Sequence, residues 1–407
     1  MNTTVQDYDY NLSYFDYENY HRHPQWTALE LFTNNYQQIH GYASCVLCIL
    51  SILGNTLNIL ILSKRQIRSP TNLLLASVSA VNTVMMLVYV IYTLNYWVIH
   101  LNQCFFQTLA WTVFALFHLN LVSTLRHIST WLTLAMAVLR VQLLQLQITE
   151  LKAFRRAKIH IVLCLTIVPI FHIPSYITQS IVWYPMSDTC TRVFNYTKPV
   201  PYVGPSVFSI KFNNMPLKFS FWLQGILFQL VPCLLLTAYM ILLIYTLFIN
   251  WERRKRLTRN RRIRKHDDCR SAGTFRATLV LVTLLAVFLI TELPSGILCL
   301  MAAIAGQRWM NVLLNLNEFN ELLMIISTLV AFILYASLSS LYRETLSATI
   351  KDMLSVITQG MPKNYILQKS KTISIDYQSL HITSKPNSTS VIIHSNKISH
   401  QDGDVFL

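Results

Sequence analysis

Seven long apolar stretches restrict this chain to folds that cross a membrane. A helix of roughly 20 residues spans the hydrocarbon core of a bilayer. Only 13% of the residues are charged, whereas about a quarter is usual for soluble domains. No internal repeat is visible, which argues against an inverted-repeat transporter. The predicted spans are residues 41–64, 72–97, 113–146, 158–183, 217–250, 275–305 and 319–341.

Basic residues gather in alternate loops, which predicts the orientation in the membrane. Residues 64–71 hold Lys64, Arg65 and Arg68, and residues 252–276 hold eleven Lys or Arg. Lys and Arg mark cytoplasmic loops, so we expect the N-terminus outside and the C-terminus inside. The net charge of +15 reflects mostly this asymmetry. Because the basic clusters adjoin apolar spans and no nucleic-acid motif accompanies them, we expect no nucleic-acid partner.

Glycosylation sequons and cysteines agree with this orientation. The Asn-x-Ser/Thr sequons at Asn2, Asn11 and Asn195 all fall on the predicted outer face. Five of the eight cysteines lie in spans and Cys269 lies in a cytoplasmic loop, so Cys104 and Cys190 remain for the oxidising side. We expect these two to form a disulfide; the alternative is two free or separately paired thiols. The first apolar run starts near residue 41, after an acidic, Tyr-rich segment, so we expect no cleaved signal peptide.

Four stretches in the predicted spans have a recognisable pattern. They are "GNTLNILIL" from Gly54, "SPTNLLLASVSAVN" from Ser69, "FHLN" with "ISTWLTLAMAVLR" up to Arg140, and "TELPSGILCLMAAIAG" from Thr291. They resemble rhodopsin-like G-protein-coupled receptors of the invertebrate FMRFamide and myosuppressin type, including the nematode class-w serpentine group. The resemblance covers roughly residues 41–355. It implies an all-α membrane protein, a seven-transmembrane helix bundle with a short amphipathic eighth helix. It also implies a receptor rather than an enzyme, with no cofactor and no metal.

Some of the signalling residues of the family are present in this chain, and others are replaced. Asn55, Arg140 and Tyr335 occupy family positions, so we expect them to act in G-protein coupling. The acidic residue that usually precedes Arg140 is Leu139 here, and the second-helix aspartate is Asn82. A neutral Asn82 binds a cation weakly, so we expect no functional sodium site.

Glu292 and Pro294 interrupt an otherwise apolar span. Pro294 matches the family's sixth-helix proline, which frees a backbone carbonyl and provides a hinge. A carboxylate inside a membrane indicates a functional site and needs a partner. Arg126 precedes Arg140 by fourteen residues, four helical turns on one face, and the fold implied by the resemblance sets it opposite Glu292. We therefore predict an Arg126–Glu292 ion pair, which either fixes packing or switches helix six when a ligand binds.

The resemblance further implies a peptide ligand that ends in Arg-Phe-amide. Candidates for contact with its arginine are Glu318, Glu321 and Asp188, besides the pair of Arg126 and Glu292. Candidates for contact with its phenylalanine are the aromatic residues Trp222, Tyr92, Tyr96 and Trp111. Ordinary packing or loop solvation explains the same residues equally well.

These predictions divide the chain into an extracellular tail (1–40), a receptor domain (41–341), an amphipathic juxtamembrane helix (342–357) and a disordered cytoplasmic tail (358–407). The expected partners are an extracellular peptide, a heterotrimeric G protein, membrane lipids, and possible arrestin and receptor-kinase contacts in the tail. We expect a multi-pass protein of the plasma membrane. The alternatives are a small-molecule chemosensory receptor of the same fold and, from another class, a seven-helix channel or transporter.

Overall fold

The structure is a computed structural model, and contact between its parts divides the chain after Ser347 into two units, Met1–Ser347 and Ala348–Leu407. The described residues are 24–65, 67–95, 108–146, 148–184, 199–260, 265–305, 309, 312–313, 315–338 and 340–359.

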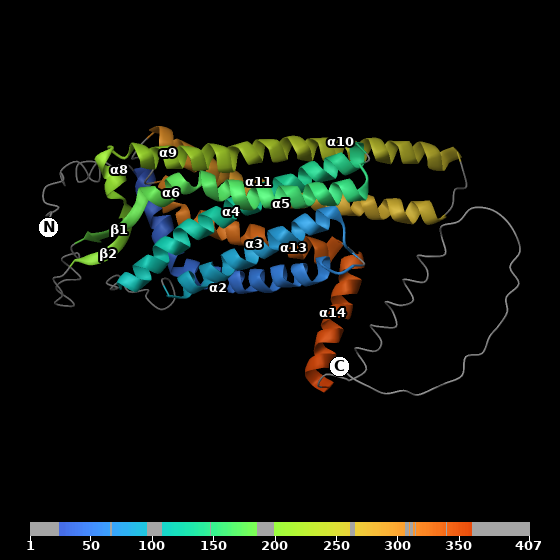
Figure 1. The fold of residues 1–407 in the computed structure, drawn as a ribbon, viewed down its shortest axis with the longest axis horizontal. Coiled ribbons are helices and arrows are strands. Elements are labelled where there is room, and N and C mark those ends of the chain that lie inside the picture. The colour runs from blue at the N-terminus through green and yellow to red at the C-terminus, as the bar shows by residue number, and fades with distance from the viewer. Residues whose placement is uncertain are drawn as a thin grey trace, which may run out of the picture. The chain divides into compact units, whose positions relative to one another are not determined.

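Seven helices in the described ranges are long and apolar enough to cross a membrane, which confirms the predicted number of spans. Within the first unit they run side by side as a bundle (Figure 1). The spans are formed by α2 (Pro24–Leu62), α3 (Pro70–Thr93), α4 (Leu109–Gln145), α5 with α6 (Glu150–Phe171, Ile173–Thr178), α9 with η2 and α10 (Met215–Leu223, Gln224–Leu230, Val231–Asn260), α11 (Lys265–Ala305) and α13 (Asn317–Leu338).

The bundle buries its core along helix faces and leaves other faces apolar but uncovered. Leu132, Met136 and Leu139 of α4 are fully buried at its centre. By contrast, Leu234 of α10 and Val162 of α5 are 68% and 59% exposed. In a span, such outward apolar side chains face lipid hydrocarbon instead of water, so their exposure fits the membrane setting.

A β-hairpin lies at one end of the bundle, together with the short helix α8 (Val207–Lys211) (Figure 1). Strands β1 (Gln179–Tyr184) and β2 (Val200–Pro205) pair antiparallel, with Gln179 opposite Pro205. The prediction of helix up to residue 183 is therefore wrong at its last five residues. The run Ile181, Val182, Trp183 and Tyr184 is β-branched and aromatic, which favours a strand once a partner strand is available.

The hairpin is fixed to the bundle by polar bonds. Thr112, in the first turn of α4, donates its hydroxyl to the carbonyl of Pro201 at 3.1 Å. Ser206 donates to the carbonyl of Ile177 at 2.7 Å. A Cβ on Gly204 would lie 2.6 Å from Cγ2 of Val182 on the opposite strand, so only glycine fits there without a shift. The hairpin is thus held over the ends of α4 and α6.

Three helices extend well beyond the predicted spans. α2 begins at Pro24, although the segment before residue 41 was predicted as a tail, and its membrane-crossing part is Ile39–Leu62. α10 continues to Asn260 and α11 begins at Lys265, so most of the predicted basic loop 252–276 is helical. Lys, Arg and Glu are strong helix formers, which explains why helix continues into this charged segment.

α14 (Ser340–Gln359) covers the predicted juxtamembrane segment 342–357. Its first turns belong to the first unit, where the Tyr342 hydroxyl donates to Oδ1 of Asn58 at 2.6 Å. The eighth helix expected from the sequence is present, while its contact with lipid stays a prediction.

Candidate functional site

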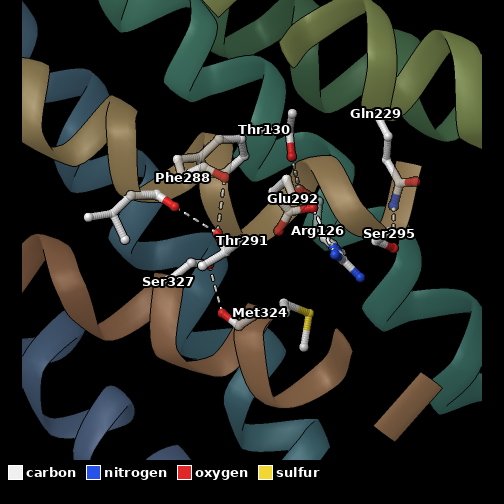
Figure 2. A network of polar contacts seen from close by, with 10 residues as sticks. Arg126, Thr130, Gln229, Phe288, Thr291, Glu292, Ser295, Met324 and Ser327 are labelled. Atoms are coloured by element: carbon white, nitrogen blue, oxygen red, sulfur yellow. Dashed lines mark hydrogen bonds and ion pairs between the residues drawn. The ribbon is translucent and has the colours of Figure 1, made fainter. Parts of the chain in front are cut away.

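The predicted ion pair between α4 and α11 is present. Nε of Arg126 donates to Oε2 of Glu292 at 2.9 Å, and Nη2 lies 2.8 Å from the same oxygen. The two side chains point toward each other in the middle of the bundle (Figure 2). Their exposed fractions are 14% for Arg126 and 3% for Glu292. A charge-paired contact is therefore enclosed where water has little access.

This enclosure makes each charge dependent on the other. Taking either ion out of water costs several kcal/mol even after relaxation, and only the partner's charge offsets that cost. Thr130 lies one turn after Arg126 and donates its hydroxyl to the Arg126 carbonyl at 3.0 Å. This hydroxyl proton is therefore not donated to Glu292. A bundle with one of the two charges missing would hold an ion without a counter-ion.

Pro294 lies two residues beyond Glu292 and weakens α11 at that level. Proline has no backbone N–H, so the carbonyl of Ile290 receives no helical bond from it. Just before this point, the Thr291 hydroxyl donates to the carbonyls of Val287 at 3.2 Å and Phe288 at 3.0 Å (Figure 2). Such side-chain bonds to preceding carbonyls often accompany a bend. The ion pair is thus anchored on α11 beside its weakest turn.

The next turn of α11 packs closely against a π-helical segment. Gln229 of η2 donates its amide to the Ser295 hydroxyl at 3.1 Å (Figure 2). A Cβ on Gly296 would lie 3.0 Å from Cβ of Gln229, which shows how closely η2 and α11 approach. The sequence analysis did not predict this contact. Gly296, two residues after Pro294, was a signal that could have indicated it.

A cavity of about 30 Å³ lies beside the ion pair. One water needs roughly 10–15 Å³ by this measure, so the cavity has room for about two. Its polar lining includes Asn82, Arg126, Ser129, Glu292, Ser327 and Thr328.

Asn82 lines this cavity with a neutral amide. Ser129 donates to Oδ1 of Asn82 at 2.8 Å. Asn55 lies nearby on α2 and donates to the carbonyl of Thr328 at 3.0 Å, which links α2 to α13. These contacts give Asn55 and Asn82 structural partners, while their role in signalling stays a prediction.

Two carboxylates, Glu318 and Glu321, stand at the N-terminal end of α13. The Tyr89 hydroxyl donates to Oε2 of Glu321, and the Asn317 amide donates to its Oε1 at 2.8 Å. One turn further out, the Gln37 amide donates to Oε1 of Glu318 at 3.2 Å. Both side chains are partly buried, so these acids are held in place between α2, α3 and α13.

Aromatic rings gather between the C-terminal half of α3 and the N-terminal half of α4. The ring of Tyr92 stacks on that of His118 at 4.1 Å and faces that of Trp111 at 6.1 Å. Phe114 packs against Trp111 at 5.0 Å. Trp222 stands apart from this set, because it lies on α9 and is 49% exposed.

At the opposite end of the bundle, Arg140 bonds a hydroxyl where related receptors offer an acid. Its Nε and Nη2 donate to Oγ1 of Thr278 on α11 at 3.3 and 3.0 Å. Tyr335 packs its ring against that of Tyr342 at 5.9 Å. Sequence reasoning missed Thr278, because a threonine next to a basic loop carries no distinguishing signal.

A buried histidine pair also escaped prediction as a contact. Nδ1 of His127 lies 2.7 Å from Nε2 of His172, and both rings pack on Phe228. The two side chains are 2% and 1% exposed. This pair ties α4 to the end of α5 next to Arg126. Among the described residues, no group of three His, Cys, Asp or Glu is arranged to hold a metal ion.

Several predicted residues lie outside the described residues. They are the ligand candidates Asp188 and Tyr96, the predicted disulfide of Cys104 and Cys190, and the predicted glycosylation sites Asn2, Asn11 and Asn195. In the described part of the chain, Cys45, Cys48, Cys164, Cys233 and Cys299 are free thiols.

Comparison with known proteins places this geometry among receptors. The profile of the family described as "Serpentine type 7TM GPCR chemoreceptor Srw" matches residues 42–353. The chain is 26% identical over 349 residues to the G-protein coupled receptor dmsr-1 of Caenorhabditis elegans, covering 76% of this chain and 68% of the relative. It is 24% identical over 358 residues to the sex peptide receptor of Drosophila melanogaster, covering 82% and 77%.

A solved structure shares the fold. Squid rhodopsin superposes with a TM-score of 0.56 at 14% sequence identity, over 86% of this chain and 93% of that one. At that identity the likeness concerns the arrangement of the helices alone.

Proposed function

Because the chain belongs to the serpentine 7TM GPCR chemoreceptor family Srw, we propose that it binds an extracellular peptide and activates a heterotrimeric G protein. Members of this family are receptors and not enzymes, and the chain is a multi-pass protein of the plasma membrane. Its N-terminus faces outward in this proposal, because Lys64, Arg65 and the basic segment around α10 and α11 all adjoin one end of the bundle.

The observation that carries the proposal is the ion pair of Arg126 and Glu292 beside Pro294. It connects the helix that carries Arg140 to the helix that contains Pro294. A ligand that enters from the outer end and disrupts the Arg126–Glu292 contact removes a restraint on α11 at the turn before Pro294. The inner half of α11, held to Arg140 through Thr278, then separates from α4 and opens a surface for the G protein.

The outer carboxylates favour a basic ligand. Glu321 lies on the outer side of the pair and is fixed by neutral donors, Tyr89 and Asn317. Hydrogen bonds from neutral groups leave its negative charge uncancelled, so a guanidinium from a peptide would gain a charge-assisted contact there. In the same proposal, the aromatic cluster around Tyr92 and Trp111 receives the ring of a C-terminal phenylalanine amide.

The relatives support a peptide over a small molecule. One is named for the sex peptide, and it aligns over 82% of this chain. A second candidate function, small-molecule chemoreception, follows from the description of the family as chemoreceptors. The aromatic cluster would then hold a compact ligand, and the outer acids would have no basic partner.

Nucleotide exchange with a peptide panel tests the proposal. Receptor-bearing membranes with added G protein receive amidated peptides ending in Arg-Phe-amide and the same peptides with citrulline in place of arginine. Citrulline keeps the shape of arginine without its charge. We expect the arginine peptides to stimulate exchange and the citrulline peptides to be weaker on the wild type.

The variant Glu321→Gln provides the matched control. It should lower the potency of the arginine peptides and leave the citrulline peptides nearly unchanged, since the charge contact is already absent in them. Equal losses for both peptide series would refute the assignment of Glu321. Activation by small odorants and by no peptide of the panel would favour the second function.

A further inference from the structure

An aromatic patch joins the part of α2 that precedes its membrane span to the first turn of the α13 span. The span of α2 begins at Ile39, and Phe32 lies seven residues before it, which is roughly 10 Å of helix. The ring of Phe32 stacks on that of Tyr36 at 5.9 Å, and the ring of Phe319 on α13 meets both edge-on, at 6.2 and 6.1 Å. Phe32 and Phe319 are 47% and 37% exposed.

Lipid does not account for the exposure of Phe32, whereas Phe319 lies in the first turn of the α13 span, Asn317–Ser337. The outward apolar faces of the spans lie at the level of the hydrocarbon, but Phe32 lies about two turns beyond it. The patch also adjoins charge, because Glu318 precedes Phe319 and its Oε2 is enclosed without a hydrogen-bond partner. Exposed aromatic side chains that gather in one patch are typical of surfaces that recognise another chain.

The patch is continuous with the candidate ligand site. Along α13, Glu321 lies one turn inward of Glu318, and Gln37 of α2 bonds Glu318 directly. Burial, followed by the charges of Glu318 and Glu321, raises the pKa of the Tyr36 phenol. Both carboxylates are therefore close enough to act on the patch, and a line of groups runs from Arg126 and Glu292 to the outer end of α2.

We propose that Phe32, Tyr36, Phe319 and Glu318 form a second docking surface for the peptide ligand, which takes residues upstream of the end bound in the bundle. The occupant carries an aromatic or large aliphatic side chain against the rings and a basic group beside Glu318. The chain's own N-terminal segment does not suit this surface, because its acidic residues would lie beside the like charge of Glu318. These residues are Asp7, Asp9, Asp16 and Glu18. This inference rests on the proposed peptide-receptor function.

Two peptides with one C-terminus separate the two sites. One is a tetrapeptide ending in Arg-Phe-amide, and the other is a decapeptide that extends it with a phenylalanine and a lysine upstream. On the wild-type receptor the decapeptide should be more potent by about tenfold, the factor that corresponds to ~1.4 kcal/mol of added contact. Surface expression, measured on intact cells, corrects each variant for folding.

The double variant Phe32→Ala/Phe319→Ala should remove the decapeptide's advantage and leave the potency of the tetrapeptide unchanged. Glu318→Gln alone should reduce the advantage of a lysine-bearing decapeptide, but not of one with norleucine at that position. Leu31→Ala is the matched control, because Leu31 is 62% exposed on the same helix and outside the ring contacts. It should preserve the advantage.

The outcomes distinguish this inference from the proposed function. If both peptides activate the receptor and the decapeptide keeps its advantage on the double variant, the docking surface is wrong and the receptor function stands. The docking surface is also wrong if the double variant weakens both peptides equally. If no peptide activates the wild type, the proposed peptide ligand fails, and the docking surface fails with it.

Discussion

Neutralising one member of the Arg126–Glu292 pair should destabilise the receptor, whereas neutralising both should not. The Glu292 side chain is 3% exposed and that of Arg126 is 14% exposed, so either single change leaves a buried charge without its counter-ion. Removing one partner of a buried ion pair costs about 3–5 kcal/mol, while replacing both is often neutral or stabilising. The coupling between the two sites should therefore be several kcal/mol.

The experiment is a double-mutant cycle of Arg126→Met and Glu292→Gln, followed by thermal unfolding of the purified receptor in detergent. On the scale of soluble domains, each single variant should unfold on the order of 10 °C below the wild type. The double variant should unfold within a few degrees of the wild type. Single effects that simply add in the double variant would refute the reasoning, since additivity means that the two charges do not interact.

Signalling assays on variants at the same two positions distinguish an ion pair that only fixes helix packing from one that acts as a switch. The charge-reversed variant Arg126→Glu/Glu292→Arg keeps an ion pair of opposite polarity between α4 and α11. If the pair is a switch, this variant should recover peptide-stimulated exchange that each single reversal loses. The neutral double variant should recover stability but not stimulation. Full stimulation in the neutral double variant would show that the pair only fixes helix packing.

Three further predictions concern the inner half of the bundle. Thr278→Val should raise ligand-independent nucleotide exchange several-fold, because Arg140 loses both hydrogen bonds to Thr278, at 3.3 and 3.0 Å. Hydrogen bonds from a charged donor are worth about 1.5–3 kcal/mol. Thr278→Ser keeps the hydroxyl and should not raise exchange. Replacing choline chloride by sodium chloride should leave peptide affinity unchanged, because Asn82 offers no charge, and a clear sodium effect would contradict this. Tyr342→Phe should lower unfolding stability by ~1 kcal/mol through loss of the 2.6 Å bond to Asn58, as measured by thermal unfolding.

The sequence was sufficient for the spans because they depend on hydropathy, and for the central contact because helical periodicity was combined with the resemblance to a known fold. An apolar run of twenty or more residues with few charges has few alternatives to a membrane helix, and all seven predicted spans were found. Fourteen residues before Arg140 return Arg126 to the same helix face, and the fold implied by the resemblance sets that face opposite Glu292. The pair then followed from the need of one buried charge for another.

Other features depend on tertiary contacts that no local pattern encodes. Residues 179–183 form a strand only because residues 200–205 lie opposite. The π-helical turn from Gln224 to Leu230 precedes Pro232 but has no signature of its own. Thr278 and Tyr342 became partners of Arg140 and Asn58 through the packing of distant helices. The early start of α2 at Pro24 is stabilised by contacts with α13 and the residues just before it, through Gln37 to Glu318 and Thr33 to the Asn315 carbonyl, both at 3.2 Å.

The distance between the inner ends of α4 and α11 tests the central claim most directly. Spin labels on these two ends report it by pulsed electron resonance, in the wild type and in Arg126→Met, without ligand and with an activating peptide. The account predicts that both the peptide and the loss of Arg126 shift the distribution to longer distances. A distribution that stays unchanged when the Arg126–Glu292 pair is removed would contradict it.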